Sequence, residues 1–135
     1  MIELSNSNAQ VLAAGQSAIF NTVILHKGCT ECYRKNSGTV SLTQSKTVYE
    51  VSFNCNIGAT AEGDGQIAIT LDGSPLPETT AIVTTAAAGD LTNVSATTCL
   101  QTCCKPVSYN VLLTNTGTTE INLGANPRFS VKPIL

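Results

Sequence analysis

The chain has 135 residues, of which 42% are hydrophobic and only 12% are charged, and its formal net charge is −2. This length fits one domain with a core of its own and leaves no room for a second. A slightly acidic chain has no basic field to hold a phosphate backbone, so we expect no nucleic-acid partner.

The polar residues are mostly uncharged, with 19 Thr, 11 Ser and 11 Asn. Threonine favours strands, whereas serine and asparagine disfavour helix interiors, so the class is all-β. No apolar stretch approaches the ~20 residues of a membrane span, and the first residues lack the cationic start of a signal peptide. We therefore expect cytoplasmic synthesis without a signal peptide, and no membrane partner.

Residues 1–26 do not show a clear alternation of apolar and polar residues. Residues 1–14 are small and polar and are predicted as an N-terminal arm, with a first edge strand as the alternative, and residues 15–135 are predicted as a single domain. Residues 18–26 read as a strand with apolar side chains on both faces. Such a strand is expected to lie between a sheet and a neighbouring subunit.

The clearest pattern in the chain runs over residues 48–57. Tyr49, Val51, Phe53, Cys55 and Ile57 share one parity, and polar residues fill the other. This period-2 alternation predicts a central strand with one buried and one wet face.

The remaining strands are separated by turn residues. A loop over residues 27–38 carries Cys29, Cys32 and four charged residues, and a second loop over residues 99–105 carries Cys99, Cys103 and Cys104. Short strands are predicted at 40–42, 67–71, 81–85, 94–100, 107–114, 121–123 and 128–134. About eight to ten short antiparallel strands with Gly, Pro, Asn and Asp turns predict a jelly-roll sandwich.

The six cysteines fall into two groups. Cys55 lies on the inward parity of the central strand, where a thiol behaves as a small apolar residue. For the five in the loops, Cys29, Cys32, Cys99, Cys103 and Cys104, three alternatives stay open. They could form one or two disulfides, supply the thiolates of a zinc site, or remain free thiols.

No catalytic arrangement can be drawn from the other reactive residues. His26 is the only histidine, and a catalytic pair would need a thiol beside it and an orienting group. The acids Glu62, Asp64, Asp72 and Glu78 occupy predicted turns and are expected to be solvated. We expect no enzyme, no cofactor, and no catalytic, cofactor-binding or metal-binding residues.

Several strand and turn sequences resemble a known family. They are Phe-Asn-Thr (20–22), Val-Tyr-Glu-Val-Ser-Phe (48–53), Ile-Ala-Ile-Thr-Leu-Asp-Gly (67–73), Ala-Ala-Gly-Asp-Leu (87–91), Leu-Thr-Asn-Thr-Gly (113–117), Ile-Asn-Leu (121–123) and Phe-Ser-Val-Lys (129–132). In this order they resemble the TNF-like trimeric jelly-roll heads of spore-surface collagen-like proteins. Over nearly the whole chain they resemble more closely the small head decoration proteins of tailed phages and prophages of Firmicutes. Residues 1–14 contain no Gly-x-y repeat, unlike the stalk of the spore-surface pattern.

The resemblance implies a homotrimer and a virion location on the capsid surface. We therefore expect a non-enzymatic capsid decoration protein whose partner is the major capsid protein, with apolar strand faces around Ile19, Phe20 and Tyr109 lying along the threefold axis. The alternative is a receptor- or glycan-binding head of a phage fibre or spore surface. In that case exposed loops would make the contact.

Overall fold

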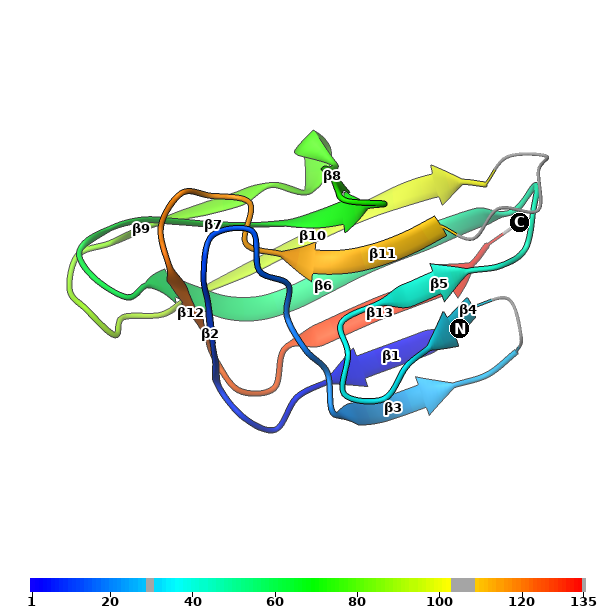
Figure 1. Ribbon diagram of the computed structural model, residues 1–135, viewed down its shortest axis with the longest axis horizontal. Helices are drawn as coiled ribbons and strands as arrows, with labels where there is room; N and C mark the ends of the chain where they lie inside the picture. Colours follow the sequence, from blue (N-terminus) through cyan, green and yellow to red (C-terminus); the bar gives the residue numbers. More distant parts are fainter. Residues whose placement is uncertain (29–30, 103–108, 135) are drawn as a thin grey trace.

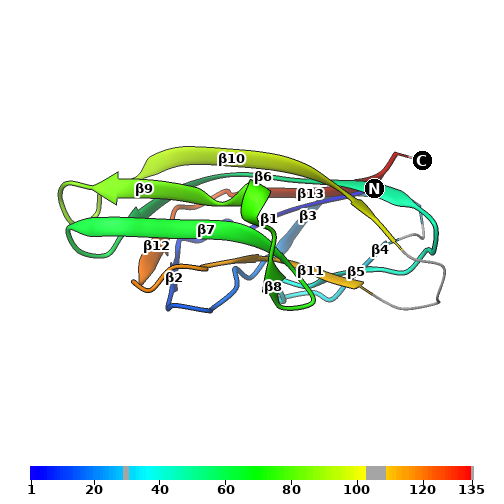
Figure 2. The same ribbon diagram turned by 90° about the horizontal axis from the view of Figure 1, so that it is seen from above.

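A computed structural model describes residues 1–28, 31–102 and 109–134 of the chain. These residues form thirteen strands in two antiparallel sheets that pack face to face, as a jelly-roll sandwich. The edge-on view in Figure 2 shows the two layers. The all-β prediction is therefore confirmed. Within the described part of the chain, no helix is long and apolar enough to cross a membrane.

The larger sheet is built around one long strand. β6 (Val48–Ala59) pairs with β10 (Thr92–Gln101) along one edge, and with two shorter strands, one after the other, along the opposite edge. Figure 1 shows the succession from β6 outward to the lower edge of the molecule. The other strands of this sheet are β12 (Ile121–Leu123), β2 (Gln10–Leu12), β13 (Arg128–Pro133), β1 (Ile2–Ser5) and β3 (Thr22–His26).

The smaller sheet covers the inner face of the larger one. Its central strands are β11 (Tyr109–Thr114) and β7 (Gly63–Leu71), which pair antiparallel. The predicted turn at Asp72-Gly73 joins β7 to β8 (Ser74–Pro75) as a two-residue hairpin, and both turn residues have positive φ, as a type I′ hairpin turn requires. The other elements on this side are β4 (Glu31–Tyr33), β5 (Val40–Leu42), β8 (Ser74–Pro75), the 3-10 turn η1 (Pro77–Thr79) and β9 (Ala81–Thr85).

The alternation in β6 places the core as the sequence predicts. Tyr49, Val51, Phe53, Cys55 and Ile57 are all buried, while Asn54 and Asn56 are exposed. Apolar side chains of β1, β7, β11, β12 and β13 complete the same core cluster. A strand with neighbours on both edges and a second sheet on one face has only its other face left for water, which is the pattern read from the sequence.

Residues 1–14 differ from the predicted arm. β1 lies between β13 and β3, and its Ile2 and Leu4 are completely buried. Two apolar residues alternating with Glu3 and Ser5 are too short a pattern to decide between an arm and a strand from the sequence. Ile2 and Leu4 nevertheless lie in the core, because β1 pairs with a neighbouring strand along each of its two edges.

The strand predicted over residues 18–26 is shorter in the structure. Only Thr22–His26 form β3, because residues 17–20 turn inward and make isolated bridges to Thr114 and Ser37. Phe20 is completely buried and its ring stacks on Phe129, with centroids 5.4 Å apart. The expectation that Phe20 faces a threefold axis is therefore wrong, because its ring belongs to the core of a single chain.

Candidate functional site

The residues considered for catalysis are separate from one another. His26 is exposed at the end of β3, and Glu62 is exposed between β6 and β7. The other three acids each accept a local hydrogen bond: Asp64 from the Thr84 hydroxyl, Asp72 from a backbone N–H of β11, and Glu78 from the hydroxyl of a β10 threonine. No group of three His, Cys, Asp or Glu that could hold a metal occurs among the described residues.

The cysteines that the structure describes lie in different places. Cys55 is buried in the core, and burial raises the pKa of its thiol to about 12, as the sequence reading of an apolar thiol requires. Cys32 on β4 and Cys99 on β10 are exposed, and neither forms a disulfide within the described ranges. Cys29, Cys103 and Cys104 lie outside the described residues. The choice between disulfides, a zinc site and free thiols therefore stays a prediction.

An apolar surface lies at one edge of the larger sheet. We define the edge surface as Ile19, Val23, Ile24 and Leu25, whose exposed fractions are 43%, 47%, 50% and 41%. β3 is the outermost strand of its sheet and all five of its residues are exposed. Figure 1 shows it outside β1, at the lower edge.

Sheet edges are often protected by charged residues, proline, a β-bulge or a covering segment. β3 carries no charged residue and no proline over Thr22–Leu25, and its pairing with β1 has a register shift at Glu3/Leu4. Of the three residues expected at a threefold axis, Ile19 lies on the edge surface, Phe20 is in the core, and Tyr109 is half-buried against the core. Exposed aliphatic side chains gathered at one sheet edge make this edge a candidate contact surface.

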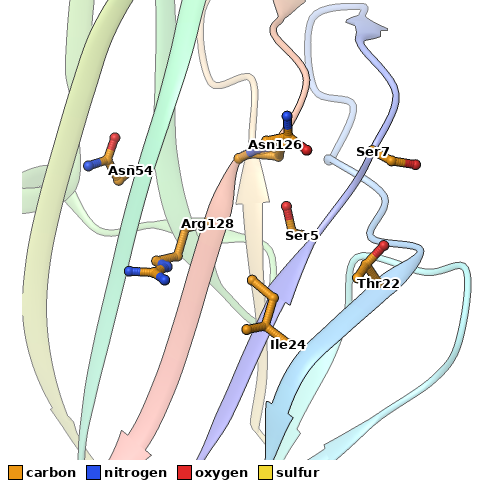
Figure 3. A pocket seen from close by; sticks show the side chains of 8 residues that line it. Ser5, Ser7, Thr22, Ile24, Asn54, Asn126 and Arg128 are labelled. Atoms are coloured by element: carbon orange, nitrogen blue, oxygen red, sulfur yellow. The ribbon is translucent and has the colours of Figure 1, made fainter.

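A polar cavity of about 580 Å³ lies beside the edge surface. Figure 3 shows Ser5 between Asn126 and Ile24, with Thr22 and Ser7 to one side. The polar cavity is lined by Ser5, Ser7, Thr22, Ile24, Asn54, Asn126, Pro127 and Arg128.

The register explains why these side chains meet. Asn54 pairs with Arg128, and Ser5 pairs with Thr22, on the face of the larger sheet that points away from the core. Side chains of the same parity on neighbouring strands form a row across a sheet. β1, β3, β6 and β13 are distant in sequence, so the sequence reasoning missed this row. The polar parity of β6 was its only visible signal.

Hydrogen bonds fix the loops that wall the cavity. The Asn6 amide donates to the Ile19 carbonyl at 2.7 Å, and its side-chain oxygen accepts from the backbone N–H of Asn8. The backbone N–H of Asn126 donates to the Asn6 carbonyl at 2.8 Å. Asn126 has a φ of 62°, which asparagine tolerates better than most residues. Both loops are thus held by the same buried asparagine.

Several polar groups of the cavity have no partner in the described part of the protein. The side chains of Ser5, Ser7 and Asn126 make no hydrogen bond there, and the Ser5 hydroxyl is open to solvent. The nearest carboxylate oxygen to the Arg128 guanidinium belongs to Glu3, at 3.9 Å, which is beyond hydrogen-bonding distance. The cavity therefore presents donors and acceptors that are free to bind a ligand.

No protein-family model matches the chain, and no curated protein sequence matches it. Solved structures do match. The vertex protein P5 of phage PRD1 has 13% sequence identity over 96% of this chain and 94% of its own, with a TM-score of 0.50. This likeness supports the jelly-roll fold.

Two sugar-related structures align with lower scores. The C-terminal domain of EclA, a sugar-binding protein, has 10% identity over 95% of this chain and 79% of its own, with a TM-score of 0.43. The CBM35 module of Cellvibrio japonicus Abf62 has 15% identity, covers 97% of this chain and 95% of its own, and has a TM-score of 0.38.

Proposed function

We propose that the protein is a non-enzymatic, homotrimeric decoration protein that binds the outside of a phage capsid. The observation that carries the proposal is the edge surface, because a chain with four exposed aliphatic side chains at a sheet edge is suited to self-association. The sequence resemblance to phage head decoration proteins supports the virion location. The jelly-roll fold is one that a phage vertex protein also has.

Burial of the edge surface would contribute free energy to assembly. Complete burial of a valine, leucine or isoleucine contributes ~1.5–3 kcal/mol, so four side chains that are nearly half exposed contribute about 3–6 kcal/mol per copy. The run Thr22–Leu25 carries no charge that would repel a second copy. Three copies around one axis would cover this surface in each chain.

The capsid contact is proposed for a different face. The outer face of β6 and β10 carries an uncharged row of Asn54, Asn56 and Asn93, in which the Asn93 amide donates to both of the others at 2.8 and 3.0 Å. Such a flat hydrogen-bonding face suits docking on the major capsid protein, since it exposes little apolar area before binding.

Light scattering with one matched pair of variants tests the trimer. We expect the wild type to have three times the chain mass at micromolar concentration and Leu25→Lys to have the mass of one chain. Ile82→Lys is the control, because Ile82 is 61% exposed on β9, outside the edge surface, and this variant should stay trimeric. A monomeric or dimeric wild type would overturn the homotrimer.

A recognition head on a fibre or spore is the second candidate, and the polar cavity is the observation that favours it. The two functions differ in their target. A decoration protein binds purified capsids that lack it and ignores host cells, whereas a recognition head binds cells directly. Pelleting assays with capsids and with cells, using the same labelled protein, separate them.

A further inference from the structure

We propose that the polar cavity binds one unit of an acidic saccharide, with the sugar carboxylate on Arg128 and the ring hydroxyls on Ser5, Ser7 and Asn126. The inference names a ligand for the recognition function and rests on it. The polar cavity shares Ile24 with the edge surface, and its other lining residues lie outside that surface.

The unpartnered polar groups are the first reason. Ser5 is only 8% exposed as a residue, but its hydroxyl is open to the solvent of the cavity, where a ligand can replace water as its hydrogen-bond partner. The Ser5 hydroxyl lines the cavity and has no partner among the described residues. The Asn126 amide, in the same wall, brings both a donor and an acceptor. Hydroxyls and amides together match the mixed donors and acceptors of a sugar ring.

Arg128 is the second reason, and it decides the charge of the ligand. Its guanidinium presents a planar fork of donors that fits a carboxylate in two parallel hydrogen bonds. Glu3 reduces the local positive charge but leaves these donors free at 3.9 Å. The next charged groups along the sheet, Lys132 and Glu50, pair with each other at 3.2 Å. Arg128 is thus the cation available to a ligand in this cavity.

The apolar part of the lining limits both size and affinity. Ile24 and Pro127 offer aliphatic surface to the C–H face of a sugar, and no aromatic ring lines the cavity. A volume of about 580 Å³ lies in the usual range for small-ligand sites. Without ring stacking, we expect a dissociation constant of about 1 mM, which three copies on one particle would strengthen through multivalency.

Titration of the full chain followed by amide NMR tests the inference, with glucuronic acid as the probe. Glucose is the matched neutral probe, because it has a hydroxymethyl group where glucuronic acid has the carboxylate. We expect saturable shifts at Ser5, Asn126 and Arg128 with glucuronic acid, and at least tenfold weaker binding of glucose. Equal binding of the two sugars would overturn the role of Arg128. Equal binding of acetate or inorganic phosphate would overturn the saccharide, and absence of saturable shifts would overturn the site.

Variants locate the binding. Arg128→Gln should weaken glucuronic acid binding at least tenfold, while Lys132→Gln, which removes the same charge from the same strand, should change it less than twofold. If Arg128→Gln does not fold, Asn126→Asp serves instead, because aspartate also tolerates the positive φ and its carboxylate repels the ligand. Unchanged binding in the folded variant overturns the site. Leu25→Lys should bind glucuronic acid normally, so failure of the trimer and failure of the cavity are distinguishable.

Discussion

Replacing Phe20 by alanine tests whether this ring stabilises the fold of a single chain or a contact between chains. Phe20 is completely buried and stacks on Phe129 with an interplanar angle of 6°. Truncating a buried phenylalanine costs ~3–5 kcal/mol, a large share of the 5–15 kcal/mol that stabilises a typical domain. We expect Phe20→Ala to lower the free energy of unfolding by that amount. The neighbouring Ile19→Ala, at a position 43% exposed, should change it by less than about 0.5 kcal/mol.

Urea unfolding of each variant, at several protein concentrations, measures these values. Because the loss in Phe20→Ala arises within one chain, it should persist at concentrations where every variant is monomeric. If Phe20→Ala is unfolded, Phe20→Leu gives a smaller loss in the same direction. A double-mutant cycle with Phe129→Ala should show coupling between the two rings. The reasoning is refuted if Phe20→Ala alters the oligomeric state while leaving monomer stability unchanged.

Three further predictions concern buried positions. Burial raises the pKa of Cys55 to about 12, so in the folded protein the thiol stays protonated at a pH where the unfolded chain already loses this proton. The contribution of Cys55 to the free energy of unfolding is therefore fully present below the ordinary thiol pKa and is lost as pH rises toward 12. In folded protein at pH 8, iodoacetamide should modify the exposed Cys99 and spare Cys55. Gly58→Ala should cost about 3 kcal/mol in urea unfolding, because the new methyl would lie 1.9 Å from the Asp90 carbonyl oxygen. Asn115→Asp should cost at least about 3 kcal/mol by thermal unfolding, since the buried amide donates to two backbone carbonyls.

Each of these has an outcome that contradicts it. Rapid modification of Cys55 in folded protein would mean that the core strand opens at that point. A Gly58→Ala protein as stable as Gly15→Asn, where open space surrounds the substituted position, would mean that the close approach of residue 90 relaxes freely. An Asn115→Asp protein with unchanged melting temperature would mean that the two carbonyls find other donors.

The core could be predicted where apolar and polar residues alternate over a long stretch of the sequence. The ten-residue run over 48–57 contains five inward side chains, and it is the central strand of the larger sheet. β1 was unpredictable for the opposite reason, because its four residues contain too few periods to be recognised, and pairing with β13 and β3 decides its place. In residues 18–26 the apolar composition was visible, but the inward turn at Phe20 depends on a bridge to Ser37, which no local pattern encodes.

The site was less predictable than the fold. The apolar character of residues 23–25 is plain in the sequence, but their exposure follows from the position of β3 at the end of its sheet. The polar cavity joins residues 5 and 128 through the register of neighbouring strands. A serine or asparagine on the wet face of a strand carries no signal of its own, so only the assembled sheet reveals the cavity.

The place of β1 between β3 and β13 has a consequence for biosynthesis. The ribosome makes β1 well before its partner strand at residues 128–133. Until then, one edge of β1 is unpaired in each nascent chain. Neighbouring nascent chains on the same mRNA can form incorrect intermolecular pairs along this edge. Translation that stalls before residue 128 should therefore yield aggregates, and a chaperone that shields residues 2–5 would improve the yield of folded protein.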